Sequence, residues 1–237
     1  MSGPQCCENP PTFGSSTGEI GRIEEIGGLK SYIAGSLDSK LAVVLIADIF
    51  GYEAPKLRQV ADKVAAAGFY VVVPDFFYGD PWLPEKPLAS WLPNHQPDDK
   101  GCEDTRKVVA DLKSKGASAV GVAGFCWGGM VISKLPPYGE IEAAVILHPG
   151  PLSADDINAT KVPTAFFGAE FDEHAPPDQL KKFGELLSAK SVDNFVKIYP
   201  GVAHGWSTRY EDDDEHVVKQ AMEAHSDMLN WLTKYLK

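Results

Sequence analysis

The stretch from Ala119 to Gly129, which reads AVGVAGFCWGG, decides the fold of this 237-residue chain. Its apolar start predicts a buried strand, and two glycines then flank Cys126 in the pattern Gly-x-Cys-x-Gly. A sharp turn from strand to helix leaves no room for Cβ atoms on its flanks, so it requires glycines there. The turn would present Cys126 at the rim of a sheet, before a helix N-terminus that favours a thiolate. Cys126 is therefore a candidate nucleophile, and the alternative is a buried cysteine that only fills space.

Candidate partners for this thiol follow it along the chain. Asp172 comes shortly after the apolar run 162–168, and His204 comes just after the strand-like run 195–199. Nucleophile, acid and histidine, in this order and each past the end of a predicted strand, are typical of the α/β-hydrolase fold. The histidine would take the thiol proton, and the carboxylate would fix the histidine tautomer.

Other polar and aromatic residues near these positions leave alternatives open. Glu170 is a second candidate acid, but it follows its strand so closely that Asp172 is preferred. His174 is interpreted as a residue at the rim of the site. His148 ends a strand on the same side and either lines the pocket or is a hydrogen-bonded structural histidine. Trp206 either lines the pocket or packs.

Strands and helices alternate along the chain. The expected strands are short apolar runs at 41–47, 70–73, 119–123, 143–147, 164–168 and 195–199, after a hairpin over 21–36. The expected helices are amphipathic and lie at 55–67, 103–115, 178–189 and 215–235. This alternation predicts one α/β domain over residues 19–237, with a mostly parallel, doubly wound sheet flanked by helices. A lead segment, residues 1–18, would wrap the surface or fray.

The segment 76–100 interrupts this alternation. It contains five prolines together with Trp82 and Trp91. Long irregular insertions are usually lids, binding loops or disordered linkers, and the tryptophans argue against disorder. We expect a lid or rim beside the candidate site, with a plain surface excursion as the alternative.

Composition limits the partners and the location. The hydrophobic content of 44% is ordinary, and the formal net charge of −11 argues against nucleic acid and anionic membranes as partners. No apolar run could span a bilayer, and the N-terminus lacks the features of a secretory signal. Four cysteines without such a signal predict a reducing, cytoplasmic location.

The sequence predicts no metal and no cofactor. It contains no dinucleotide-binding glycine signature, no phosphate loop and no set of residues with metal-ligand spacing. Cys6 and Cys7 are neighbours in the proline-rich start of the chain. Because no cluster of Cys or His accompanies them, we expect surface thiols rather than a metal site.

These motifs make the chain resemble the dienelactone hydrolases, also called carboxymethylenebutenolidases, and especially their plant-like cytosolic branch. The resemblance runs from about Ile20 to the C-terminus and rests on ADIFG at 47–51, VPDF at 73–76, GFCWGG at 124–129, the loop 168–172 and HGW at 204–206. The family has the α/β-hydrolase fold and a Cys-Asp-His triad. The resemblance therefore implies that Cys126, Asp172 and His204 are catalytic, and that the Ile49 and Trp127 amides form an oxyanion hole.

The chain departs from the bacterial members of this family around the substrate. They carry a glutamate where this chain has Asp48, and there the carboxylate holds the resting thiol, a role that the shorter aspartate leaves open. They also bind the substrate carboxylate with two arginines. Arg209 could supply one of them, although it lies one place further on, and the chain has none near Tyr78 for the other. The resemblance thus implies a substrate other than the bacterial dienelactone.

We expect a hydrolase that cleaves a small lactone or activated ester through a thioester on Cys126, as a monomer or weak homodimer. One alternative is a glucan-acting glycoside hydrolase, since some plant relatives carry a glucanase label. That chemistry needs two carboxylates about 5–9.5 Å apart and leaves Cys126 idle. A second alternative is a non-catalytic small-molecule sensor on the same fold, which an intact triad argues against.

Overall fold

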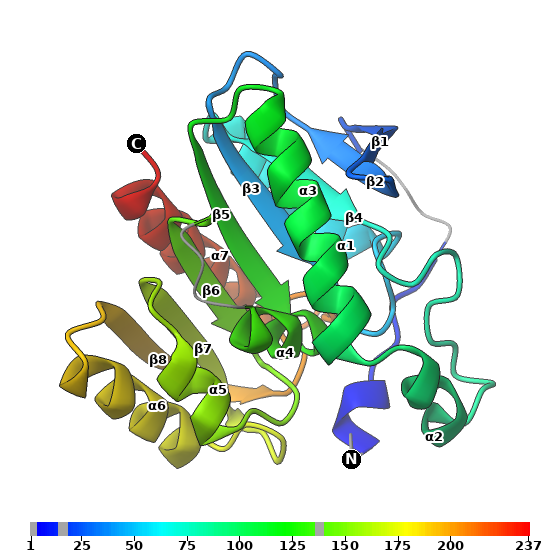
Figure 1. Ribbon diagram of the computed structural model, residues 1–237. Coiled ribbons are helices and arrows are strands. Elements are labelled where there is room, and N and C mark those ends of the chain that lie inside the picture. Colours follow the sequence, from blue (N-terminus) through cyan, green and yellow to red (C-terminus); the bar gives the residue numbers. More distant parts are fainter. Residues whose placement is uncertain (1–3, 14–18, 136–139) are drawn as a thin grey trace.

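A central eight-stranded sheet organises the chain in the computed structural model, which describes residues 4–13, 19–135 and 140–237 (Figure 1). Its strands are β1 Arg22–Ile26, β2 Leu29–Ala34, β3 Leu41–Ile46, β4 Tyr70–Pro74, β5 Ala119–Phe125, β6 Ala143–Leu147, β7 Thr164–Phe171 and β8 Asn194–Ala203. They are ordered β1-β2-β4-β3-β5-β6-β7-β8. Only the β1–β2 and β2–β4 pairs are antiparallel, so the predicted mostly parallel sheet is confirmed.

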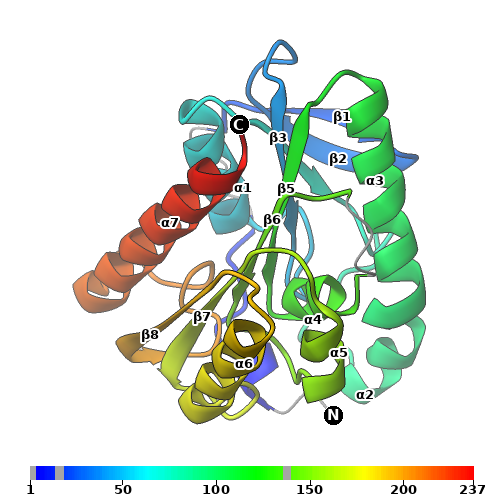
Figure 2. The ribbon, with the colours of Figure 1, turned by 60° about the vertical axis from the view of Figure 1, so that its left-hand side comes forward.

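Helices cover both faces of the sheet. They are α1 Pro55–Ala66, α2 Leu88–Trp91, α3 Cys102–Ser114, α4 Trp127–Lys134, α5 Ala154–Ala159, α6 Pro177–Ala189 and α7 Glu215–Tyr235. The turns that are not α-helical are η1 Pro4–Cys7 and η2 Leu92–Asn94, both 3-10 helical, and η3 Pro97–Gly101, a π-helix. α1 and α7 lie on one face, and α3, α4, α5 and α6 lie on the other (Figures 1 and 2). None of the helices in the described ranges is both long and apolar enough to cross a membrane.

The alternation of side chains along β3 explains this three-layer arrangement. Val43 and Leu45 pack under α1 and α7, whereas Val44 and Ile46 pack under the helices of the opposite face. All four are fully buried. A strand buried on both faces reads as a continuous apolar run, which is why the sequence identified β3 correctly.

Two strands extend further than their apolar runs predict. β7 continues to Phe171 and β8 continues to Ala203, because the two strands pair beyond a register shift between Ala169 and Phe171. Asp172 and His204 therefore follow their strands directly. The pairing rests on contacts between segments distant in sequence, so the strand ends were not readable from local polarity.

The short helix α5 was not predicted either. Its six residues contain one buried side chain, Ile157, which is too little to produce a helical pattern in the sequence. The helix is instead specified at its start, where the hydroxyl of Ser153 accepts a hydrogen bond from the Asp156 amide at 3.1 Å.

The start of the chain differs most from expectation. η1 packs against the ends of the sheet strands, and Cys6 is only 1% exposed. The prediction of a surface thiol is therefore wrong for Cys6, while Cys7 is half-buried. The reason is tertiary: polar groups from two distant loops bind this segment, as described below. Residues 1–3 and 14–18 of the expected lead segment lie outside the described residues.

The burial of His225, a residue of α7, predicts that the stability of the protein depends on pH. His225 is buried, its Nε2 donates to the Ser207 carbonyl at 2.8 Å, and burial together with the charge of Lys63 lowers its pKa to about 4. In the unfolded chain this histidine binds a proton below about pH 6.5, whereas in the folded chain it does so only below about pH 4. The stabilisation is therefore fully present above about pH 6.5 and is lost as the pH falls from there to about 4. The contribution is about 3 kcal/mol.

Urea unfolding between pH 7 and 4 checks this prediction. His225→Gln should give a shallower loss of stability with falling pH than the wild type, whereas the same change at exposed His216 should leave the slope unaltered. An identical slope in the wild type and in His225→Gln would contradict it.

Candidate active site

Cys126 stands on a strained turn between β5 and α4. Its φ of +50° and ψ of −104° lie where residues other than glycine rarely occur. Neighbouring backbone holds this conformation, since the Cys126 amide donates to the Leu147 carbonyl at 3.1 Å and its own carbonyl accepts from Gly150 at 3.0 Å. Strain of this kind persists where a side chain must be presented in a defined direction.

The flanking glycines are required by close contact, as the sequence predicted. A Cβ atom on Gly124 would lie 2.3 Å from the Gly128 carbonyl oxygen, and one on Gly128 would lie 2.1 Å from the Ile46 carbonyl oxygen. The Gly128 amide also donates to the Ala47 carbonyl at 3.1 Å. The turn is therefore pressed directly onto the end of β3.

Asp172 and His204 form a buried pair at the neighbouring strand ends. His204 Nδ1 lies 2.9 Å from Asp172 Oδ2, and neither side chain is exposed. The other oxygen, Oδ1, accepts from the amides of His174 at 2.9 Å and Ala175 at 3.1 Å. The carboxylate is thus fixed in place and directs the His204 Nδ1 proton to itself, which leaves Nε2 free to act as a base.

The alternative acid, Glu170, does not reach this histidine. Its side chain is exposed, and its Oε2 accepts from the Gly201 amide at 2.7 Å. Of the two candidate acids, the structure brings only Asp172 to His204.

A second cysteine, which sequence reasoning missed, completes the cluster. The Cys6 sulfur lies 3.7 Å from the Cys126 sulfur and 3.9 Å from His204 Nε2. These three atoms lie within 4.8 Å of one another, and all three residues are buried. Cys6 and Cys126 are 120 positions apart, so no local signal in the sequence could have joined them.

The contact with Cys6 suppresses ionisation of the candidate nucleophile. That contact and burial raise the pKa of Cys126 well above its ordinary value, against the opposing charge of His204. The thiolate favoured by the helix N-terminus is thus outweighed while Cys6 is in place.

His204 shifts in the other sense. Burial alone would lower its pKa, but attraction to Cys126 and the hydrogen bond with Asp172 outweigh burial and raise the pKa to about 9. The attraction requires a charged Cys126 and disappears while the thiol keeps its proton. The support from Asp172 remains in either state, so we regard it as the lasting cause.

The expected oxyanion donors lie beside this turn. Ile49 is buried after β3, and Trp127 begins α4. In the described part of the chain, no carbonyl accepts a hydrogen bond from either amide. The Trp127 ring nitrogen takes no part in this role. Its Nε1 donates a hydrogen bond to the His95 carbonyl at 2.8 Å.

Asp48 pairs with Arg209, and Arg209 in turn bonds the N-terminal segment. Asp48 Oδ2 lies 3.4 Å from Arg209 Nε, and burial raises the Asp48 pKa against the opposing charge of Arg209. Arg209 Nη1 donates to the carbonyls of Cys6 and Glu8, each at 2.8 Å. Among the described residues, Asp48 has no hydrogen bond with Cys126. Arg209 Nη2 is buried without a partner.

The His148 ring packs against the rings of both His204 and Trp206. His148 is fully buried, its Nε2 lies 2.8 Å from the Ser207 hydroxyl, and burial lowers its pKa well below the ordinary value. Its ring lies 5.3 Å from the His204 ring and 5.1 Å from the Trp206 ring. Of the two interpretations of His148, the structure supports the hydrogen-bonded structural histidine. Trp206 also packs against Tyr199.

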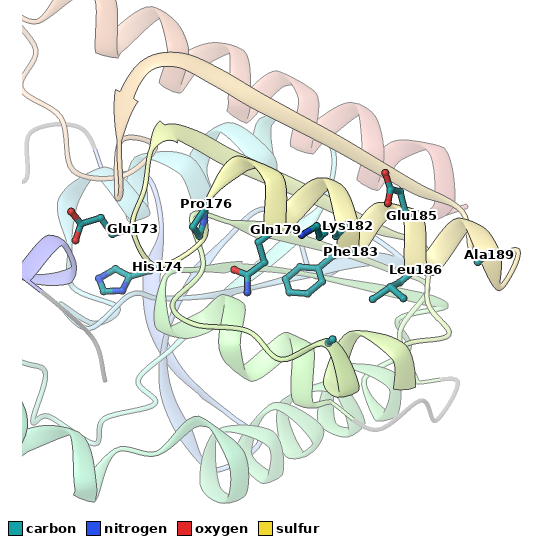
Figure 3. A pocket seen from close by; sticks show the side chains of 10 residues that line it. Glu173, His174, Pro176, Gln179, Lys182, Phe183, Glu185, Leu186 and Ala189 are labelled. Atoms are coloured by element: carbon teal, nitrogen blue, oxygen red, sulfur yellow. The ribbon is translucent and has the colours of Figure 1, made fainter.

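A large open groove runs along α6 (Figure 3). Its volume is about 870 Å³. Glu173 and His174 lie at the end near η1, and Phe183 and Leu186 line the groove further along α6. The His174 ring is 5.2 Å from the His204 ring, which agrees with its predicted position at the rim.

The segment 76–100 is packed, not loose. Trp82 contacts Phe50 at 5.6 Å between ring centroids, and Trp91 contacts Phe77 at 4.9 Å. Both tryptophans are buried. Through the Phe77–Trp127 contact, at 4.8 Å, the segment adjoins the residue that follows Cys126.

The sheet, the strained cysteine turn and the buried Asp172–His204 pair define an α/β-hydrolase. The chain belongs to the dienelactone hydrolase family, whose model matches residues 29–236. Membership places it among the carboxylic ester and lactone hydrolases.

Two individual relatives carry different names. The chain is 41% identical over 188 residues to a maize protein called endo-1,3;1,4-beta-D-glucanase. The aligned region covers 77% of this chain but only 61% of the maize protein. It is 31% identical over 228 residues to the mouse carboxymethylenebutenolidase homolog, covering 92% and 93% of the two chains.

Solved structures show the same fold at lower identity. A protein of Klebsiella pneumoniae, assigned as a dienelactone hydrolase, superposes with a TM-score of 0.75 at 20% identity over 91% of this chain and 99% of its own. A dienelactone hydrolase-like promiscuous phosphotriesterase from metagenomic libraries gives 0.71 at 16% identity, over 92% and 98%.

Proposed function

We propose that the protein hydrolyses small lactones or activated carboxylic esters, with Cys126 as nucleophile, His204 as base and Asp172 as the residue that orients His204. The observation that carries this proposal is the meeting of a strained, glycine-flanked cysteine with a buried histidine whose far nitrogen bonds a fixed carboxylate. The family assignment agrees with it.

We assign a residue to each step of the reaction. His204 takes the proton of Cys126, and the thiolate attacks the substrate carbonyl. The amides of Ile49 and Trp127 hold the resulting oxyanion, and donors of this kind are typically worth about 2.7–4 kcal/mol each. The alkoxide or enolate leaves with the proton from His204. Water, activated by His204, then cleaves the thioester and releases the acid.

The thiol nucleophile favours substrates with good leaving groups. A thiolate is itself a good leaving group, so the tetrahedral intermediate proceeds to thioester only if the alcohol side departs readily. Enol lactones and aryl esters meet this condition better than amides or plain alkyl esters.

The substrate must approach past η1. Cys126 is 2% exposed because Cys6 lies against it. We propose that η1 moves aside and that substrate enters from the groove along α6, whose inner end is His174. The unpartnered Nη2 of Arg209 would then be available to an acidic group of the substrate, in a chain whose net charge of −11 otherwise repels anions.

The proposal extends to the segment 76–100, to the domain that contains it and to its location. The packed segment 76–100 forms a rim of the site through its contacts with Trp127. It would lie within a single domain over 19–237 that acts in the cytoplasm as a monomer or weak homodimer.

Mass spectrometry of a quenched reaction tests the mechanism. With an aryl ester in excess and Cys6 kept reduced, the intact wild-type protein should gain one acyl group, and peptide mapping should place it on Cys126. The buried Cys102, in a Cys102→Ala control, should make no difference to the adduct. Rapid turnover without any adduct on Cys126 would contradict a thioester.

The name of the maize relative calls for a separate assay on mixed-linkage glucan. A glycosidase needs two free carboxylates across the bond, whereas Asp172 is held by His204 and Asp48 by Arg209. Glucan hydrolysis that persists in Cys126→Ala would establish that activity and displace the esterase proposal.

A further inference from the structure

We propose that Cys6, Cys126 and His204 form a binding site for a zinc ion, which holds the protein in a closed, inactive state. The site shares two residues with the proposed triad, but the binding of zinc does not depend on whether the protein hydrolyses esters.

The distances within the cluster fit tetrahedral zinc. With Zn–S and Zn–N bonds of about 2.3 and 2.0–2.1 Å, tetrahedral angles place two sulfur ligands about 3.8 Å apart and sulfur and nitrogen about 3.6 Å apart. Here Cys6 Sγ lies 3.7 Å from Cys126 Sγ and 3.9 Å from His204 Nε2. All three ligand atoms lie within 4.8 Å of one another, so a metal at the centre requires shifts of about 1 Å or less. A disulfide would require the two sulfurs to close to about 2.05 Å.

His204 is already arranged as a metal ligand. Its Nδ1 bonds Asp172 Oδ2 at 2.9 Å, so Nε2 is left for a metal and faces the Cys6 sulfur at 3.9 Å. Metal-binding histidines almost always carry such a partner on the far nitrogen, which fixes the ring and strengthens the ligand. Asp172 is held in turn by two backbone amides.

Cys6 is held in place from two sides. Arg209 Nη1 bonds the carbonyls of Cys6 and Glu8, each at 2.8 Å, and Gln5 Oε1 accepts from the Glu173 amide at 2.8 Å. These contacts tie η1 to the loop after His204 and to the loop after Asp172. The third ligand thus comes from a segment that is bound before any metal arrives.

The chemistry of the ligands selects zinc over magnesium or calcium. Two sulfurs and an imidazole are soft ligands that suit zinc, whereas magnesium and calcium require oxygen. On binding, both thiols release their protons to solvent, and the two thiolates are neutralised by the dication, so no unpaired charge remains buried. Three protein ligands leave the fourth position to water.

Zinc at this site would block hydrolysis. It would engage the Cys126 sulfur and His204 Nε2, the two atoms that start the proposed reaction, and would clamp η1 over them. Removal of zinc would free all three.

Direct binding tests the site without any substrate. The reduced protein, stripped with a chelator, is titrated with zinc against a chromophoric competitor, and bound zinc is counted by elemental analysis after gel filtration. The wild type should retain one zinc per chain. Cys6→Ser should weaken the affinity by about 100-fold or more, since loss of a mere supporting partner already costs 10–100-fold. Cys7→Ser, the matched control, should bind like the wild type.

Cobalt provides a second readout of the ligands. Cobalt(II) bound by thiolates shows a sulfur-to-metal charge-transfer band, which should appear in the wild type and Cys7→Ser and weaken in Cys6→Ser and Cys6→Ala. Melting curves of the stripped proteins establish that each variant is folded. If hydrolysis is observed, a stoichiometric amount of zinc should abolish it in the wild type and chelator should restore it.

Three outcomes would overturn the proposal. They are zinc affinity equal in the wild type and both Cys6 variants, zinc binding lost equally with Cys7→Ser, and a Cys6–Cys126 disulfide under oxidant in a protein that never retains zinc when reduced. Failure of ester hydrolysis would leave the binding result intact, and failure of zinc binding would leave the esterase proposal intact.

Discussion

Replacement of Cys126 by alanine should reduce kcat/KM toward an activated aryl ester by about 10⁴-fold or more, the loss that follows removal of a triad nucleophile. In the proposed mechanism this side chain supplies the attacking atom, and no other described thiol except Cys6 lies near His204. Serine at this position should be almost as inactive. Its hydroxyl is far less acidic than a thiol, and the pocket is built around sulfur.

Steady-state kinetics with metal-free, reduced protein measure this effect. Cys102→Ala is the matched control, because Cys102 is equally buried but belongs to α3, away from the triad. It should keep nearly full activity. A Cys126→Ala enzyme within tenfold of the wild type would show that Cys126 is not the nucleophile.

Replacement of Asp172 by asparagine should lower kcat by about 10⁴-fold, comparable to the loss seen when a triad aspartate is amidated elsewhere. The geometry explains the size. Oδ1 of Asp172 accepts from the amides of His174 and Ala175, so the asparagine oxygen must remain there. Its NH₂ group would then face His204 Nδ1 and force the proton onto Nε2. His204 would direct a hydrogen at Cys126 instead of a lone pair.

Glu170→Gln is the matched control for this prediction. Glu170 lies two positions earlier and bonds Gly201, so its amidation should change kcat less than threefold. Both variants should be compared across pH, because a tautomer error persists at every pH whereas a lost charge only shifts the profile. Equal losses at Glu170 and Asp172 would contradict the assigned roles.

Cys6 affects both the acidity of Cys126 and its access to solvent. Its contact raises the pKa of Cys126 and closes access to it. Cys126 is thus covered and less acidic than an ordinary thiol while Cys6 lies against it. Asp48 pairs with Arg209, and Arg209 bonds the Cys6 carbonyl, so this buried ion pair is linked to Cys126 through the N-terminal segment.

Much of this was readable from the sequence. Apolar runs identified the central strands because parallel strands are buried on both faces, and GFCWGG identified the nucleophile turn because only glycine fits its flanks. The order of Cys126, Asp172 and His204 followed from the same fold, since parallel strands present their ends at one edge of the sheet.

Only the tertiary structure could decide how Cys6 is used. Two residues 120 positions apart meet because Arg209 and Gln5 fix the chain start against loops from the far end of the sheet. The same holds for Glu170, Asp48 and Arg209, whose partners depend on contacts across strands. Local pattern determines which elements form and which residues reach an edge. Contacts between distant segments determine which side chains bond there, because burial forces each polar group to find its partner among whatever the fold brings near.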